Sequence, residues 1–229
     1  RINRGEAPHP PPKDAEADFF VIDRKSPETA RATIVELVAS RIPKRFGLDP
    51  IRDIQVLSPM IRGEAGTLAL NQALQAALNP KGVAIQRGNA SFRVGDKVMQ
   101  LRNDYDRNVW NGDVGIITSV NTEEDSLVVS FDEGIERREV TYETASLDEL
   151  TLAYACTVHK SQGSEYPAVV IPLLTAHFVM LSRNLLYTAV TRGRRLVVLV
   201  ADPRAVDLAV KSDRIDERQT RLAARLREA

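Results

Sequence analysis

The sequence lacks the features that would place a protein outside the cytoplasm. Its 229 residues contain one cysteine, Cys156, in an apolar run, so a disulfide framework or a paired-cysteine metal site is excluded. No apolar run reaches the roughly 18 residues that a membrane span needs, and no signal peptide is recognisable. We therefore expect a cytoplasmic protein that has no membrane partner and no metal site.

The sequence also lacks an excess of charge and a phosphate-binding loop. It holds 31 basic and 31 acidic residues, so its formal net charge is zero. A globally basic nucleic-acid-binding protein is not indicated, although a local basic face stays open because binding follows the distribution of charge. The pattern GxxxxGK[ST] is absent, and no Gly-Lys pair occurs anywhere in the chain.

What is present is enough apolar material for a sizeable core. Hydrophobic residues make up 43% of the chain, which suits one large domain or two small ones. The chain opens with RINRGEAPHPPPKDAEAD and without a methionine. We interpret residues 1–17 as a proline-rich linker at the front of a piece of a longer protein.

Strand and helix patterns alternate on both sides of the middle of the chain. FFVID (19–23) and IQVLSP (54–59) are compact apolar runs, each followed by a helical pattern. The first helix, capped by Ser26, is predicted to end where PKRFGLDP breaks its spacing. The same alternation returns in AVVIPLL (168–174), a helix over LSRNLLYTAVTRGRR (181–195), LVVLVAD (196–202) and a helix from Pro203. This order predicts a parallel sheet covered by helices.

A different texture interrupts this pattern. From about Phe92 to Tyr142, short alternating segments are separated by Gly, Asn and Asp, which is typical of a small antiparallel barrel. The predicted organisation is an α/β domain formed by 18–89 and 146–213, with a β module inserted at 90–145. The charged stretch 214–229 is predicted to be a terminal helix or tail.

Three polar clusters are candidate sites. TVHKSQGSE (157–165) lies between two apolar runs, where a parallel sheet could present a ligand; the alternative is a polar loop without a partner. LLYTAVTRGRR (185–195) gathers arginines that could bind phosphate or only favour a helix end. SPMIRGEAGT (58–67) offers Arg62 and main-chain N–H groups to an anion, or is an ordinary connection.

Together these stretches resemble a known family. VLSPMIRGEAGTLALNQALQ, AYACTVHKSQGSEYPAVVIPL and LLYTAVTRGRRLVVLV resemble, in this order, motifs IV, V and VI of superfamily 1 helicases. The closest resemblance is to the RecD/TraI/Dda group and to RecD-like proteins of the exodeoxyribonuclease V alpha subunit type. FRVGDKVMQLRNDYDRNVWNGDVGII also resembles their inserted SH3-like barrel. The resemblance implies a RecA-like domain that carries this barrel.

The resemblance also implies roles in nucleotide chemistry. In such helicases ATP lies between two RecA-like domains, and this chain resembles the second of them. Arg192 would be the arginine finger, which stabilises charge on the transferring phosphoryl group, and Arg62 a second phosphate sensor. Glu165 would accept a hydrogen bond from the ribose. Gln162, Gly163 and Tyr187 would shape the cleft.

The implied DNA contacts come from two places. Thr157, His159 and Lys160 resemble single-strand DNA contacts in the helicase motif. In the barrel, the candidates pair positive charge with an aromatic ring, which suits strand binding, although Trp110 could instead belong to the barrel core. These barrel candidates are Arg93, Lys97, Arg102, Arg107 and Trp110.

The expected function is the C-terminal motor portion of an ATP-dependent DNA helicase that acts 5′ to 3′ in recombination or repair. ATP and Mg²⁺ belong to the full-length parent, and this piece is not expected to bind them tightly or to hydrolyse ATP without the P-loop domain. Its partners would be single-stranded DNA and the N-terminal RecA-like domain of the parent; RecBCD-like subunits stay open. The alternative is a non-enzymatic nucleic-acid-binding module built around the barrel.

Overall fold

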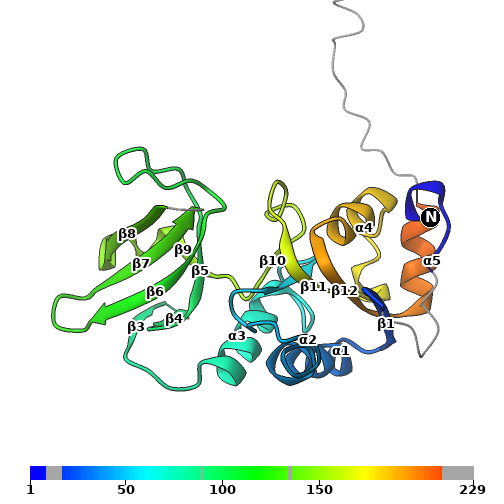
Figure 1. Ribbon diagram of the computed structural model, residues 1–229, viewed down its shortest axis with the longest axis horizontal. Coiled ribbons are helices and arrows are strands. Elements are labelled where there is room, and N and C mark those ends of the chain that lie inside the picture. The colour runs from blue at the N-terminus through cyan, green and yellow to red at the C-terminus, as the bar shows by residue number, and fades with distance from the viewer. Residues whose placement is uncertain (9–16, 89, 134–135, 213–229) are drawn as a thin grey trace, which may run out of the picture.

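The chain forms two lobes that lie side by side (Figure 1). The computed structural model describes residues 1–8, 17–88, 90–133 and 136–212. One lobe contains a five-stranded parallel sheet, and the other contains a five-stranded antiparallel sheet and a two-stranded hairpin. The predicted terminal helix or tail at 214–229 lies outside the described residues.

The parallel sheet has the strand order β1-β12-β11-β2-β10, and every neighbouring pair runs parallel. This confirms the predicted parallel sheet. Its central strands are apolar on both faces because both faces are covered by helices or loops. The strands are β1 (Phe19–Asp23), β2 (Ile54–Ser58), β10 (Ala155–Thr157), β11 (Tyr166–Leu173) and β12 (Gly193–Ala201).

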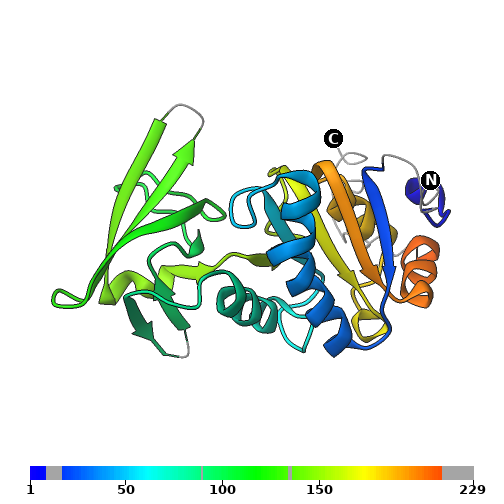
Figure 2. The same ribbon diagram turned by 60° about the horizontal axis from the view of Figure 1, so that its bottom comes forward.

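Helices lie against opposite faces of this sheet (Figures 1 and 2). One face packs against α1 (Pro27–Glu36), the continuing helical stretch 37–46 and α3 (Thr67–Leu78). The other face packs against α4 (Arg183–Val190) and α5 (Pro203–Lys211). The fold is therefore the RecA-like layered sheet that the sequence predicts.

The first helix starts and ends where the sequence predicts, but a π-helical turn interrupts it. The Ser26 side chain accepts a hydrogen bond from the Thr29 N–H at 3.2 Å and so caps α1. The helical stretch ends within PKRFGLDP, as predicted, but at Gly47 and not at Pro43: a π-helical turn, η2 (Leu37–Arg41), leads into α2 (Ile42–Phe46), which carries Pro43 near its start. The wider turn already interrupts the regular bonding, so a residue without N–H is tolerated there. Gly47, at φ 65°, ends the helix.

The helix predicted over 181–195 is shorter than expected. It ends at Val190, and β12 already begins at Gly193, so Arg194 and Arg195 lie on a strand. A Cβ at position 193 would stand 2.7 Å from the Val197 side chain and 2.9 Å from that of Val169. Glycine therefore allows β12 to start there, beside Tyr166 of β11.

The antiparallel lobe has the order β8-β7-β6-β5-β9 and encloses its own apolar core. The hairpin β3–β4 contributes Ile85 and Phe92 to that core. The predicted antiparallel texture is confirmed here. The elements are β3 (Ala84–Arg87), β4 (Ala90–Arg93), β5 (Lys97–Gln100), β6 (Val114–Asn121), β7 (Ser126–Glu133), β8 (Glu136–Glu143), η3 (Thr144–Glu149) and β9 (Leu150–Leu152).

Strand β5 belongs to the cores of both lobes. All four of its residues are buried. Val98 faces the core of the antiparallel lobe, which is the predicted barrel, whereas Met99 packs in the core of the parallel sheet. Because side chains of a strand alternate, the neighbouring Lys97 faces the parallel sheet as Met99 does. β5 is thus a strand through which the barrel touches the RecA-like lobe.

The first residues of the predicted linker are packed against the RecA-like lobe. The short 3₁₀ helix η1 (Ile2–Arg4) contacts α4 and α5, and Ile2 is buried in the sheet core. Residues 9–16 lie outside the described part of the chain. Among the described helices, none has the length and apolar composition needed to cross a bilayer.

Candidate functional site

The segment Thr157–Glu165 crosses the parallel sheet from one edge to the other. Thr157 ends β10 and lies beside Ser58, the last residue of β2. Tyr166, directly after the segment, begins β11 and lies beside Gly193, the first residue of β12. All these strands are parallel, so Thr157 lies at the carboxyl edge of the sheet and Glu165 at the amino edge. The segment can therefore expose chemistry at two separate places.

A buried anchor holds this crossing in place. Val158 is buried in the sheet core, and the buried Ser161 hydroxyl donates to the Val158 carbonyl at 2.7 Å. The Thr157 hydroxyl accepts from the Lys160 N–H at 3.3 Å. His159, Lys160 and Gln162 are exposed, and Gly163 adopts φ 88° with open space where a side chain would start. The polar side chains that the sequence singles out thus point to solvent from a fixed turn.

Arg192 lies against the far end of this segment. Its Nη1 donates to the Ser164 carbonyl at 3.0 Å, and its Nε donates to the Thr188 carbonyl at 3.3 Å. The Arg192 carbonyl in turn accepts from the Tyr166 N–H at 2.8 Å. The side chain is only half-buried, so it is oriented by main-chain oxygens while part of the guanidinium still meets solvent. Arg192 and the segment therefore meet at the amino edge of the sheet, at the Ser164–Glu165 end.

Glu165 and Tyr187 lie exposed on the same lobe. Glu165 accepts a hydrogen bond from Arg194 Nε at 2.7 Å in an exposed ion pair. Such a pair is weak in water and can exchange for a ligand. Tyr187 is 47% exposed on α4, one turn before Arg192. The sequence predicts Arg194 at a helix end, whereas the structure places it on β12 beside Glu165.

The structure does not bring Arg62 to Arg192. Arg62 lies in the connection that follows the carboxyl end of β2, whereas Arg192 precedes the amino end of β12. The connection is folded tightly: Thr67 N–H donates to the Met60 carbonyl at 3.0 Å, and a Cβ on Gly66 would stand 2.4 Å from the Arg62 carbonyl. Arg62 is exposed at the edge that also carries Thr157.

The barrel presents an aromatic pair that the sequence analysis predicted only in part. Trp110 is 36% exposed and meets the ring of Tyr105, itself 74% exposed, edge to face at 5.3 Å. Trp110 is therefore not a residue of the barrel core. Arg102 is exposed nearby in sequence and lies 3.6 Å from Asp148. Tyr105 was missed because a single tyrosine in a polar loop gives no periodic signal.

The other barrel candidates are engaged within the protein. Lys97 is only 3% exposed, so it cannot contact a DNA strand. Burial lowers the pKa of its ammonium to about 8. Arg107 pairs with Asp104 and Glu149 and lies over the ring of Tyr142. Arg93 donates to the Asn79 carbonyl at 2.9 Å. The earlier expectation for Lys97 is thus wrong, because β5 faces the parallel sheet.

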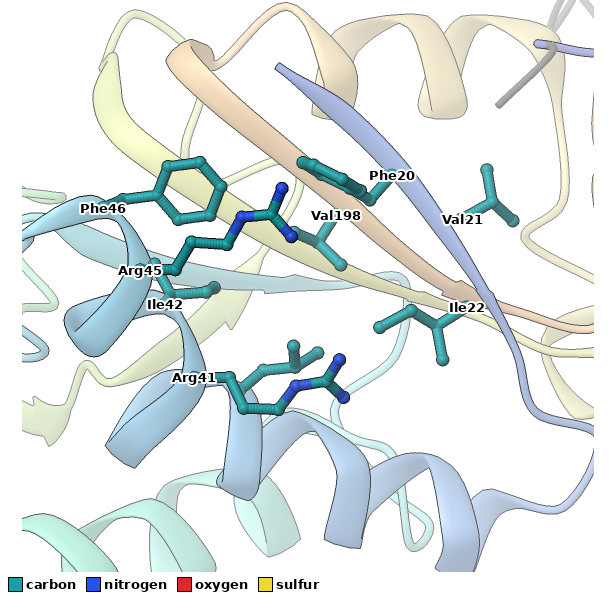
Figure 3. A pocket seen from close by; sticks show the side chains of 9 residues that line it. Phe20, Val21, Ile22, Arg41, Ile42, Arg45, Phe46 and Val198 are labelled. Atoms are coloured by element: carbon teal, nitrogen blue, oxygen red, sulfur yellow. The ribbon is translucent and has the colours of Figure 1, made fainter. Parts of the chain in front are cut away.

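A separate apolar pocket lies on the other side of the RecA-like lobe (Figure 3). It has a volume of about 120 Å³ between β1 and the helical stretch 37–46. The Arg45 guanidinium lies 5.3 Å from the ring centre of Phe20 and 5.5 Å from that of Phe46, which fits cation–π stacking. None of the predicted site residues lines it. In the described residues, no cluster of His, Cys, Asp and Glu is arranged to hold a metal ion.

Comparison with known proteins finds two helicase domain families in this chain. Residues 70–131 match the model of the ATP-dependent RecD-like DNA helicase SH3 domain, and residues 152–200 match that of the UvrD-like helicase C-terminal domain. The ATP-dependent RecD2 DNA helicase of Deinococcus radiodurans is 42% identical over 176 residues, 76% of this chain and 23% of that protein. The RecBCD enzyme subunit RecD of Mycolicibacterium smegmatis is 32% identical over 186 residues, 81% of this chain and 31% of that protein.

Among solved structures, a Pif1 helicase from Bacteroides in complex with ADP-AlF3 and single-stranded DNA is 20% identical, with a TM-score of 0.46. That match covers 76% of this chain and 49% of the Pif1 chain.

The fold and the matched regions define the class: a helicase C-terminal region that carries an SH3-like module. Within this class the chain belongs to the RecD-like superfamily 1 DNA helicases, of which it is a C-terminal portion. The matched region spans 23% and 31% of the length of the two relatives named above.

Proposed function

We propose that this chain is the second RecA-like half of an ATP-dependent DNA helicase motor that moves 5′ to 3′ in recombination or repair. The observation that carries the proposal is the path of Thr157–Glu165 across the sheet. One end of this path would contact single-stranded DNA and the other would face the nucleotide. A rigid turn between them would let hydrolysis and strand movement depend on each other.

At the amino edge, Arg192 is the proposed arginine finger. Its main-chain partners fix its direction, and its Nη2 also donates to the Thr191 hydroxyl at 3.3 Å. The N–H donors that remain are available for phosphate oxygens. Glu165 would exchange Arg194 for the ribose of ATP, with Tyr187, Gln162 and Gly163 shaping the cleft. ATP and Mg²⁺ would be held mainly by a P-loop domain, because GxxxxGK[ST] does not occur in this sequence.

At the carboxyl edge, Thr157, His159 and Lys160 are the proposed DNA contacts, with Arg102 and Trp110 adding contacts from the barrel. Arg62 is the proposed second phosphate sensor. Because it lies at this edge and not beside Arg192, its role needs a test separate from that of Arg192.

The decisive experiment compares Arg192→Ala with Arg195→Ala in a helicase that carries this region together with its P-loop domain. Arg195 is an exposed arginine three residues away and serves as the matched control. We expect Arg192→Ala to lower kcat roughly a thousandfold or more, as loss of an arginine finger does, with DNA affinity retained. The control should keep its turnover. Unchanged turnover in Arg192→Ala would favour the alternative, a binding module built around the barrel.

A further inference from the structure

A buried lysine connects the barrel to the RecA-like lobe. Lys97, the first residue of β5, is 3% exposed, and its Nζ donates to the Ile54 carbonyl of β2 at 3.3 Å. The same Nζ lies 5.7 Å from the ring centre of Tyr166, the first residue of β11. The barrel therefore inserts a cation beneath the residue that ends the Thr157–Glu165 crossing.

The main chain of Tyr166 is in turn hydrogen-bonded to Arg192. The Tyr166 N–H donates to the Arg192 carbonyl at 2.8 Å. Two residues earlier, the Ser164 carbonyl accepts from Arg192 Nη1 at 3.0 Å. The main chain around Tyr166 thus fixes both the backbone and the guanidinium of Arg192. Both of these hydrogen-bond partners lie within two residues of the Tyr166 ring.

In the part of the chain that the structure describes, the buried ammonium of Lys97 has no acidic partner at the junction between the two lobes. Within the described residues, no carboxylate lies within ion-pair distance of Nζ, and burial lowers the pKa of the ammonium to about 8. The ionisable groups that act on it are Asp49 and Asp53 before β2 and Cys156 of β10. Burial raises the pKa of the Cys156 thiol to about 11, so this group is neutral near neutral pH. An apolar side chain of the same length would avoid the cost of burying a charge.

We propose that Lys97 is a positioning residue for Arg192: its ammonium holds the Tyr166 ring, and the Ser164–Tyr166 main chain then sets the direction of the guanidinium. The barrel would in this way control how well the arginine meets the nucleotide. The structural link concerns this chain alone, whereas its effect on catalysis rests on the proposed function.

The link is tested directly by NMR on the ¹³C,¹⁵N-labelled chain from about pH 6 to about pH 10. The Arg192 Nε–H donates to the Thr188 carbonyl, and carbon-detected NMR reads the ¹⁵Nε signal of this group without relying on its exchangeable proton. We expect this signal and the Tyr166 amide to shift with the same midpoint as the Lys97 side chain, near pH 8. Lys97→Met should abolish this titration. Met99→Leu, a neutral change on the same face of β5, should keep it.

A kinetic measurement then connects the link to catalysis. In a helicase with both RecA-like halves, Lys97→Met should lower kcat roughly three- to thirtyfold with little change in KM, and Met99→Leu should not. The proposal would be overturned if the Arg192 signals did not change with the protonation of Lys97. It would also be overturned if they showed the same titration in Lys97→Met. If the NMR link holds but Arg192→Ala itself leaves turnover unchanged, the proposed function has failed and the positioning contact has not.

Discussion

At the scale of single residues, the charge on Lys97 has a proposed role in positioning Arg192 but costs stability because it is buried. Its folded pKa of about 8 lies below the ordinary value of 10.5 because burial disfavours the charged form. Below pH 8 both the folded and the unfolded chain carry the charge, and the folded state bears the full cost. Between about pH 8 and pH 10.5 the folded chain releases the proton first, so its contribution to stability rises with pH.

Replacing Lys97 by Met should therefore stabilise the chain at neutral pH by about 1–3 kcal/mol, because a buried cation without an acidic partner is exchanged for an apolar side chain. Urea unfolding at pH 7 and again near pH 10 measures this difference, which should shrink as the pH rises. A variant less stable than the wild type at pH 7 would show that the ammonium contributes net binding to Ile54 and Tyr166. If the charge on Lys97 serves function and not stability, Lys97→Met should be more stable than the wild type and turn over more slowly.

At the scale of elements, one carboxylate fastens the barrel to α3. Asp96, fully buried, accepts hydrogen bonds from Gln75 Nε2 at 2.6 Å, Asn79 Nδ2 at 2.7 Å and the Tyr154 hydroxyl at 2.8 Å. It also accepts from the Arg93 N–H at 2.8 Å. All four partners are donors, so Asp96→Asn would turn an NH₂ group toward other donors and lose the charge-assisted bonds.

We expect Asp96→Asn to cost about 2–4 kcal/mol of unfolding free energy, since buried donors then lack an acceptor. Denaturant unfolding measures this cost. Asp148→Asn makes the same chemical change at an exposed ion pair and should stay within about 0.5 kcal/mol of the wild type. Equal costs for both substitutions would show that Asp96 does not fasten the two lobes.

The sequence predicts regular elements better than the connections between lobes. Apolar runs and helical spacing determine β2, α3 and β11 locally, so these elements are predicted from the chain alone. Pro43 and Gly193 are harder to interpret, because a π-turn and a close backbone approach depend on distant partners. Lys97 is the extreme case: a lysine in an alternating strand predicts exposure, and only the neighbouring lobe makes that side of β5 an interior.

At the scale of the whole molecule, the proposed DNA contacts come from both lobes while the net charge is zero. Binding of single-stranded DNA should therefore depend on two separable terms: stacking on the barrel pair Trp110 and Tyr105, and phosphate contacts of Lys160. Trp110 is the only tryptophan in the chain, so its fluorescence reports the barrel end of the interaction directly.

These two terms predict different responses to salt. Tyr105→Ala should weaken binding of an oligonucleotide by 1–3 kcal/mol, about five- to 150-fold, with an unchanged salt slope, because stacking releases few counterions. Lys160→Ala should reduce the slope of log K against log salt by about 0.7, the value for one phosphate contact on a single strand. Titrations followed by Trp110 fluorescence at several salt concentrations give both quantities, with the exposed Lys44 as the control site for Lys→Ala. If Lys160→Ala leaves the slope unchanged while Tyr105→Ala weakens binding, the barrel pair contacts the DNA strand and Lys160 makes no phosphate contact.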